Sequence, residues 1–599
     1  MSVLIFPDAI AQRREAHSEC EWLSDWQVHS AHITAGAIRI VSLGLEAGPL
    51  YVPMPTGSGK TTGAIWGIED LANNFPDQRL CFLTPYKTSV DGVYGSLSDR
   101  LGSEVVGYYY SGALVDKATE LAKRIVVLTH AFIQANHGTL DDRDLFVVDE
   151  AIYATGEAAL KLEHFNQARS WATSHNVYPE EFIKLADYAT DLDQRLRQSD
   201  KKYIAARREG DLTWAKTIAF DLQISNHSQT IDNREVLVAT QRFSEALLAG
   251  LVFLSRGNID GDRYDPVYSA AVLGIPSIEK TIVLSATGGM VYDIAGPFRQ
   301  DMGSANYWTS PSYERLKLVQ LTGPDIRGHY STWSTTEKKD KVVRYVDWLL
   351  SQVAENIIYI TFPKKVLEGC LREYFDQPSR GELEYPFTVT KHGKQINISH
   401  HARSVGSNAF ADCKAVVYLW DNHLPQSASV QRFHTLANEE ITEEALEDAN
   451  RGQLVGNYER IREAQYIDNM MQQIGRGSVR QIDENAEAGE MTAYVFTDSN
   501  KLNRLAAQYK NCTTGTLEYE GRQVSEPSRR IDRIIWYLRL QDRRDDVLAT
   551  EVEEALGFRL SQYKDSLQNS WDMRMLGYDF VPGGRGRGNV GRFRWTRDN

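Results

Sequence analysis

The sequence contains few cysteines, and they form no pattern. The five cysteines (Cys20, Cys81, Cys370, Cys413 and Cys512) are widely spaced and odd in number, and no CxxC pair occurs. Zinc ribbons and four-cysteine iron–sulfur clusters need cysteines at closer spacing. The sequence therefore argues against these classes and favours a reducing, cytoplasmic setting.

Long apolar runs and an excess of positive charge are also missing. No run approaches the roughly 20 apolar residues that a membrane-spanning helix needs, so no membrane partner is expected. The formal net charge of -14 at pH 7 excludes a uniformly basic surface, and any nucleic-acid site must be a local groove or patch. With 599 residues, of which 42% are hydrophobic, the chain is expected to form roughly two to four globular domains.

The most informative stretch is a glycine-bearing turn between a predicted strand and a predicted helix. Residues 51–62 read YVPMPTGSGKTT. In a phosphate-binding loop, glycines let backbone N–H groups approach an anion, and the N-terminus of the next helix adds partial positive charge. Lys60 is expected to reach the β- and γ-phosphates of a nucleotide, and Thr61 to bind Mg²⁺. The residues predicted to hold the nucleotide are Thr56, Gly57, Ser58, Gly59, Lys60, Thr61 and Thr62.

Two apolar runs after this loop predict buried parallel strands. They begin at Leu80 and Ile125, and both end in polar residues. Because ligands bind at the carboxyl edge of a parallel sheet, these polar ends are candidate contacts. The residues concerned are Thr84, Pro85, Lys87, Thr129 and His130.

A third apolar run, residues 145–148, ends in the carboxylate pair Asp149-Glu150. At the end of a parallel strand, Asp149 is predicted to hold Mg²⁺, and Glu150 is predicted to orient and deprotonate a water molecule. A fourth predicted strand, residues 281–284, ends in the hydroxyl-bearing sequence Ser285-Ala286-Thr287.

In chain order, these segments resemble motifs of superfamily 2 helicases, the DEAD/DEAH-type group. Residues 57–61 (GSGKT), 149–152 (DEAI) and 285–287 (SAT) are similar to motifs I, II and III. Ile152 stands where the named subclasses have Asp or His, so the chain fits neither cleanly.

The second half of the chain continues the resemblance. Residues 356–362 resemble motif IV, residues 403–410 resemble motif V, and residues 472–480 (QQIGRGSVR) resemble motif VI. The second arginine of motif VI is displaced by one residue, because Val479 occupies its position and Arg480 follows. On a helix, such a shift rotates a side chain by about 100°.

The resemblance implies an α/β fold with two RecA-like parallel-sheet domains that bind ATP and Mg²⁺ between them. It implies arginine fingers at Arg476 and Arg480, and a γ-phosphate sensor at Gln472 or Gln473. Motif V implies nucleotide contacts at Gly406 and Asn408, and motif III implies coupling through Ser285 and Thr287. The residues implied to contact nucleic acid are Thr84, Pro85, Lys87, Thr129, His130 and Arg403.

These motifs predict four parts of the chain. Residues 1–155 and 270–330 form the first RecA-like domain, residues 331–525 form the second, and a helical insertion occupies 156–269. The insertion carries an apolar stripe with basic residues around it, and it is either a solvated helical hairpin or an arch over a nucleic-acid path. A helical insertion at this place is similar to XPD/DinG-like helicases, whose iron–sulfur domain has no matching cysteines here.

The C-terminal part, residues 526–599, is predicted to contain three helices and a hairpin, which resembles a winged helix. Its basic glycine-rich loop and last strand are expected to contact phosphates or a minor groove, unless the segment is a disordered basic tail. The candidate contacts are Arg585, Arg587, Arg592 and Arg594.

Two further features have open interpretations. Gln27 is either an adenine-recognition residue or an ordinary surface glutamine. The acidic segment 433–460 is most simply an exposed helix or loop.

The whole pattern predicts an ATP-dependent helicase or translocase that moves along single-stranded nucleic acid, with DNA favoured by the winged-helix-like end. The alternatives are an RNA helicase, or a nucleic-acid-stimulated ATPase that remodels protein–nucleic-acid complexes within a defence or mobile-element assembly, with protein partners of its own.

Overall fold

The structure of the protein is a computed structural model. It describes residues 23–44, 49–135, 140, 142–150, 158–206, 210–220, 231–256, 259–260, 263–264, 266–271, 278–286, 289–296, 310–323, 336–378, 381, 383–401, 410–420, 426–451, 454–519, 534–535, 537–538, 545–563, 567–568, 573, 578–583 and 591–596. The predicted site residues Thr287, Arg403, Gly406, Asn408, Arg585 and Arg587 lie outside these ranges.

The first sheet has six strands, and all of its strand pairs are parallel. Every residue of its second and fourth strands in chain order is buried, as expected for a sheet with helices on both faces. The four strands predicted from apolar runs are all present. In spatial order the strands are β1 (Leu50–Val52), β12 (Thr281–Leu284), β5 (Leu145–Asp149), β2 (Leu80–Thr84), β4 (Ile125–Thr129) and β3 (Val106–Tyr109).

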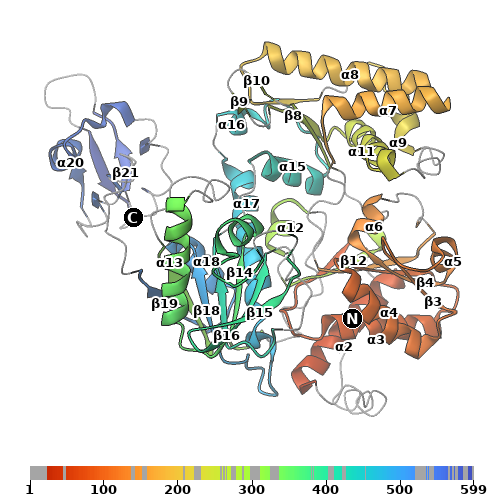
Figure 1. Ribbon diagram of the computed structural model, residues 1–599, viewed down its shortest axis with the longest axis horizontal. Coiled ribbons are helices and arrows are strands. Elements are labelled where there is room, and N and C mark those ends of the chain that lie inside the picture. Colours follow the sequence, from red (N-terminus) through yellow and green to blue (C-terminus); the bar gives the residue numbers. More distant parts are fainter. Residues whose placement is uncertain are drawn as a thin grey trace. The chain divides into compact units, whose positions relative to one another are not determined.

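Alternate residues along these strands enter two separate apolar cores, because successive side chains of a strand point to opposite faces. Phe82 and Val127 lie in the core beneath α2 (Asp25–Ser42), α3 (Lys60–Asn74) and α4 (Lys87–Leu101). Leu83 and Val126 lie in the other core, with residues of α6 (His130–Ala135) and α12 (Gly289–Ala295). Figure 1 shows this domain in red and orange, with α12 and β12 joining it from later in the chain.

The second sheet has seven strands, and all its pairs are parallel except β15–β16 at one edge. The strands in spatial order are β15 (Phe387–Lys391), β16 (Lys394–His400), β14 (Ile357–Phe362), β17 (Ala415–Tyr418), β18 (Met491–Phe496), β13 (Leu316–Leu321) and β19 (Thr513–Leu517). Among its helices are α13 (Thr336–Gln352), α14 (Lys364–Val366), α17 (Gly456–Ile474) and α18 (Ser499–Ala506). Two largely parallel, helix-covered sheets confirm the predicted α/β class.

The insertion contains a sheet as well as helices. Its main helices are α7 (Leu162–His175), α8 (Pro179–Gln198), α9 (Thr213–Phe220) and α11 (Ile231–Leu248). They pack with an antiparallel sheet in the order β6 (Ala158–Leu160), β11 (Val267–Ala270), β8 (Val252–Ser255) and β7 (Tyr203–Ala205). A two-stranded ribbon, β9 (Ile259–Asp260) and β10 (Arg263–Tyr264), lies nearby in the sequence. The predicted apolar stripe is buried, namely Phe182, Leu185, Ala189, Leu192 and Leu196.

The acidic segment 433–460 is not simply exposed, and that interpretation is wrong. It begins within α15 (Gln426–Ala437), contains α16 (Glu447–Asn450) and ends in the first turns of α17. Its apolar residues Ile441, Leu446, Ala449 and Leu454 are buried in the same core as the insertion residues. Its glutamates face outward or pair with basic residues. The acidic composition of the segment therefore gave no sign of its buried apolar residues.

The C-terminal residues form a compact unit of their own, which comprises residues 323–325 and 519–599. Its described part contains α20 (Ala549–Leu556) and an antiparallel sheet in the order β20 (Val547–Leu548), β22 (Arg592–Trp595) and β21 (Tyr578–Val581). Phe580 and Phe593 are buried in its core. The predicted hairpin is confirmed, and the resemblance to a winged helix stays a prediction.

None of the helices that the structure describes is both long enough and apolar enough to cross a membrane.

Candidate active site

The phosphate loop adopts backbone angles that favour glycine. Gly57 and Gly59 have φ of 83° and 80°, in the left-handed region. A Cβ atom on Gly57 would lie 2.1 Å from the carbonyl oxygen of Arg480, and one on Gly475 would lie 3.0 Å from Thr56. The loop therefore packs directly against the turn that follows α17, and glycine is required for this close approach.

Lys60 and Ser58 give the loop polar groups suited to an anion. The Lys60 side chain is buried, and its Nζ donates to the carbonyl oxygens of Met54 and Pro55, each at 2.9 Å. Burial lowers the pKa of Lys60, while the nearby Glu150 and Asp149 act in the opposite direction. The Ser58 hydroxyl is buried and has no hydrogen-bond partner among the described residues. A phosphate placed on this loop would give the Ser58 hydroxyl a partner and would offer Lys60 an acceptor stronger than its two carbonyls.

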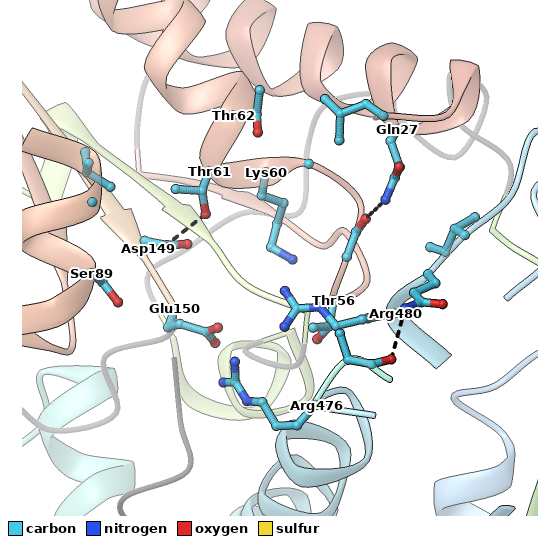
Figure 2. A pocket seen from close by; sticks show the side chains of 18 of the residues that line it. Gln27, Thr56, Lys60, Thr61, Thr62, Ser89, Asp149, Glu150, Arg476 and Arg480 are labelled. Atoms are coloured by element: carbon cyan, nitrogen blue, oxygen red, sulfur yellow. Dashed lines mark hydrogen bonds between the residues drawn. The ribbon is translucent and has the colours of Figure 1, made fainter. Parts of the chain in front are cut away.

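Asp149 and Thr61 form a candidate Mg²⁺ site. Thr61 Oγ1 donates to Asp149 Oδ2 at 3.3 Å (Figure 2). Burial raises the pKa of Asp149 to about 7, and the neighbouring carboxylate of Glu150 adds to this shift. Hydroxyl and carboxylate oxygens are the ligands that Mg²⁺ prefers. A divalent cation would offset the repulsion between the two carboxylates, so this donor set fits Mg²⁺.

Glu150 lies at the centre of the cleft in a strained backbone conformation. Its φ is 69°, which is rare for a residue other than glycine. Its backbone N–H donates to Leu284 at 2.8 Å, so β12 holds this conformation. Its Oε2 accepts a hydrogen bond from Gln472 Nε2 at 2.7 Å. Glu150 follows β5 of the first sheet, whereas Gln472 comes from α17, so the two halves of the chain meet at this carboxylate.

The structure separates the two candidate glutamines. Gln472 reaches Glu150, and its Oε1 accepts from the Arg476 guanidinium at 3.4 Å. Gln473 is buried, accepts from the Tyr359 hydroxyl at 2.7 Å and donates to the His401 carbonyl at 3.1 Å. Gln473 thus joins strands of the second sheet and does not face the cleft.

Arg476 and Arg480 both line the cleft (Figure 2). Helix α17 ends at Ile474, and Arg480 lies in a short 3₁₀ turn, so the helical rotation expected from its one-residue displacement does not apply. Burial lowers the pKa of Arg480 to about 10, and the positive charge of Arg476 contributes to the shift. Two guanidinium groups in mutual repulsion favour an anion between them.

Gln27 lies in the cleft, so the interpretation as an ordinary surface glutamine is wrong. Its Nε2 donates to the Gly57 carbonyl at 2.7 Å (Figure 2). Its backbone N–H donates to Ser24 Oγ at 3.3 Å, and its Oε1 accepts from the Ser24 N–H at 3.0 Å. This capping box at the start of α2 fixes the glutamine, and the Ser-x-x-Gln spacing was the sequence signal for it.

The cleft has a volume of about 1800 Å³ and is lined by both halves of the chain. The predicted residues Thr56, Gly57, Gly59, Lys60, Thr61, Thr62, Thr84, Pro85, Lys87, Asp149, Glu150, Arg476 and Arg480 all line it. Sequence reasoning missed Tyr86, which also lines it and whose pKa is raised by burial and by Glu150. An aromatic residue after a strand carries no signal of its own.

Other predicted residues lie elsewhere. Thr129 and His130 are at the junction of β4 and α6, and burial lowers the pKa of His130 to about 4. Ser285 is buried, and its carbonyl accepts from the Tyr51 hydroxyl at 3.0 Å. Arg592 and Arg594 are exposed on β22 of the C-terminal unit.

Comparison with known proteins agrees with the motifs. Residues 34–166 match the family model described as DEAD/DEAH box helicase. No curated protein sequence matches the chain.

Similar solved structures include three proteins that share little sequence with this chain. S. cerevisiae Dbp5 bound to RNA and ADP BeF3 is 10% identical, with 86% of this chain and 94% of that chain covered and a TM-score of 0.36. A DEAD box protein from Methanococcus jannaschii is 13% identical (83% and 97% covered, TM-score 0.26), and T4 UvsW is 10% identical (80% and 76% covered, TM-score 0.20). At such scores these likenesses carry no argument about function.

The family match covers the phosphate loop, the end of β2 and the Asp149-Glu150 pair, which line the side of the cleft that the first half of the chain forms. Residues 34–166 therefore form a domain of the DEAD/DEAH box helicase type, a family whose cofactors are ATP and Mg²⁺.

Proposed function

We propose that this chain is an ATP-driven motor that moves along single-stranded nucleic acid and separates duplex strands. The nucleic acid that we propose as its preferred substrate is DNA. One observation supports this proposal most: the hydrogen bond of 2.7 Å from Gln472 to Glu150. It joins motif VI of the second half to the candidate water-activating carboxylate of the first. Hydrolysis and the closing of the cleft are thereby linked through one contact.

The side of the cleft formed by the first half of the chain binds the nucleotide. Lys60 would exchange its two carbonyl partners, Met54 and Pro55, for phosphate oxygens, which are stronger partners for an ammonium group. Thr61 and Asp149 would hold Mg²⁺, and Gln27 fixes the loop by its bond to Gly57. When bound, ATP supplies the phosphoryl group, and Mg²⁺ neutralises part of its charge.

Glu150 and the two arginines perform the chemical work. Glu150, held by Gln472 and by its strained backbone, would accept a proton from the attacking water molecule. Arg476 and Arg480 are placed to stabilise the negative charge that develops during phosphoryl transfer. Because these groups come from opposite halves of the chain, hydrolysis requires a closed cleft, and product release would reopen it.

The C-terminal unit is the candidate second contact with nucleic acid. Arg592 and Arg594 alternate along β22 with the buried Phe593, so both guanidinium groups lie on one exposed face. Such a face suits phosphate contacts, which do not by themselves distinguish DNA from RNA. The preference for DNA therefore rests on the resemblance of this unit to a winged helix.

The proposal is tested by measuring ATP hydrolysis with single-stranded DNA, duplex DNA, single-stranded RNA or no polymer, together with unwinding of a tailed duplex. We expect stimulation by single-stranded DNA and unwinding, and both should be absent in the Lys60→Ala variant. Stimulation by RNA alone would identify an RNA helicase. Stimulation without unwinding would identify a remodelling ATPase, and hydrolysis that survives Lys60→Ala would overturn the site assignment.

A further inference from the structure

The insertion and the acidic segment are joined by side chains that complete the edge of a sheet. Strand β7 lies at one edge of the insertion sheet. Asn450 Oδ1 accepts from the Tyr203 N–H at 2.7 Å, and Asn450 Nδ2 donates to the Tyr203 carbonyl at 2.9 Å. Glu443 Oε1 accepts from the Ala205 N–H at 3.1 Å. These side chains therefore take the place of a further strand.

Ion pairs and apolar contacts also join the insertion to the acidic segment, and we call this set of contacts the joint. Glu443 pairs with Lys201 at 2.8 Å and lies 3.8 Å from Arg195, so two of the basic residues around the apolar stripe are paired within the chain. The Ile441 N–H donates to the Gly250 carbonyl at 2.8 Å. With the shared apolar core, these contacts join the described residues within 158–271 and 426–454 into one body, which we name the composite domain.

Helix α17 starts at this composite domain and contributes residues to the cores of both large sheets. Leu454, just before the helix, is buried in the composite domain. Ile461 and Ala464 lie in the core of the first sheet with residues of α12. Ile467 and Met470 lie in the core of the second sheet. Figure 1 shows α17 running from α15 and α16 toward the second sheet.

The other end of α17 reaches the ATP cleft. Its last turn carries Gln472, which bonds Glu150, and the turn after it carries Arg476. The helix has 19 residues, so it spans about 28 Å at 1.5 Å per residue. Close-packed cores resist deformation, and a displacement at one end of such a helix is therefore transmitted to the other.

We propose that the joint between the insertion and the acidic segment positions the catalytic end of α17. In this inference, which rests on the function proposed above, Asn450 and Glu443 are positioning residues for ATP hydrolysis although they lie far from the cleft. The composite domain is the element through which a ligand on the insertion would change the rate of hydrolysis.

The first test compares Asn450→Leu with Arg451→Ala. Leucine keeps the size of Asn450 but cannot bond Tyr203, whereas Arg451 pairs only with Glu447 and Asp448 in the contacts described. Asn450→Leu should displace the end of α17 that carries Gln472, so we expect kcat to fall about tenfold. ATP is bound by residues of the first half of the chain, so KM for ATP should stay within about twofold. Rates are normalised to titrated nucleotide-binding sites, which removes the effect of misfolded protein.

The control Arg451→Ala should match the wild type. A wild-type kcat in Asn450→Leu would overturn the inference. The two proposals would be contradicted by different results. If the wild-type protein shows no ATP hydrolysis that nucleic acid stimulates and that Lys60→Ala abolishes, the proposed function is wrong. If the wild-type protein is active and Asn450→Leu is equally active, only the positioning role of the joint is wrong.

A double-mutant cycle tests the route through α17. If Asn450 acts through Gln472, then Asn450→Leu should lower kcat little further in a Gln472→Ala background. Additive losses would show that the joint affects hydrolysis by another route, and they would contradict the inference.

A reversible cross-link tests whether the joint stays closed during turnover. A Cβ atom on Gly250 would lie 3.1 Å from Glu440 Cβ, below the roughly 3.5–4.5 Å found in disulfides, and Gly250 has a positive φ of 75°, so the cross-link requires a small local shift of the backbone. In the pair Gly250→Cys and Glu440→Cys, the oxidised protein should hydrolyse ATP as fast as the reduced protein. Turnover that is lost on oxidation and restored by a reductant would show that the joint opens. That result would overturn the inference.

Discussion

At the scale of single residues, the cleft concentrates unfavourable arrangements that a bound nucleotide and metal would relieve. Asp149 and Glu150 are adjacent carboxylates, Arg476 and Arg480 are neighbouring cations, and Glu150 has a left-handed backbone. Each of these raises the free energy of the folded protein. Strain of this kind persists only where the surrounding structure holds it, and here it surrounds the site of chemistry.

Glu150→Gln should separate binding from hydrolysis. Glutamine keeps an oxygen that accepts from Gln472 but cannot take a proton from water, so ATP binding should stay within a few-fold of wild type while kcat falls by about 10²-fold or more. Fluorescent-nucleotide titration and single-turnover hydrolysis measure the two properties. The control is Glu69→Gln, which alters an ion pair with Arg100 and should leave both unchanged. Wild-type hydrolysis in Glu150→Gln would show that the base is elsewhere.

The raised pKa of Asp149 predicts a pH-dependent effect of Mg²⁺. A carboxyl whose pKa rises from 3.8 to about 7 on folding stabilises the protein at low pH, and this stabilisation is lost as pH rises toward 7. A metal ion needs the ionised carboxylate and offsets the loss. Mg²⁺ should therefore raise the melting temperature more at pH 8 than at pH 5.5, as thermal denaturation would measure. In Asp149→Asn this difference should disappear, and an equal effect of Mg²⁺ at both pH values in the wild type would contradict the prediction.

At the scale of elements, the phosphate loop packs directly against the turn after α17. Gly57→Ala places a methyl group 2.1 Å from the Arg480 carbonyl position, so we expect the loop or the turn to move and kcat to fall by about 10²-fold. Gly44→Ala is a matched control, because Gly44 also has a positive φ of 63° but nothing lies within 4 Å of the added atom. That variant should lose about 1 kcal/mol of stability and no activity. Equal kcat losses in both variants would show that backbone strain alone is responsible.

The sequence predicts the elements that carry a local signal. The strands before Asp149 and Ser285 are uninterrupted apolar runs, and the loop at Gly57 has a fixed spacing, so their positions follow from neighbouring residues alone. The same reasoning places Lys60, Thr61, Asp149, Glu150 and the two arginines around one cleft.

What escaped prediction depends on distant partners. In the acidic segment, Ile441 and Leu446 are separated by glutamates, and their packing partners lie some 200 residues earlier in the chain. Gln27 precedes the loop it contacts by 30 residues. The edge strand β15 pairs antiparallel in an otherwise parallel sheet, and no periodicity distinguishes that direction. Such contacts are decided by tertiary packing, which short windows of sequence do not contain.

At the scale of the whole molecule, the chain has two compact units. The C-terminal unit has its own apolar core, so removing residues 519–599 should leave basal ATP hydrolysis within about twofold of wild type. Affinity for single-stranded DNA should fall, and the slope of log affinity against log salt should become shallower because phosphate contacts are lost. Binding measured at several salt concentrations tests this.

The point variant Arg594→Glu in the full chain should reproduce part of the effect, since Arg594 is exposed and outside the core. An unchanged salt slope in both proteins would assign the C-terminal unit to another task.

The composite domain also has a consequence for synthesis on the ribosome. The edge of β7 at Tyr203 is completed by Asn450, 247 residues later in the chain. At about 5–20 residues per second, this edge stays uncovered for roughly 12–50 seconds while the remaining chain is made. Uncovered strand edges promote aggregation. The nascent insertion is therefore expected to depend on translation speed and on chaperones before the ATP cleft is complete.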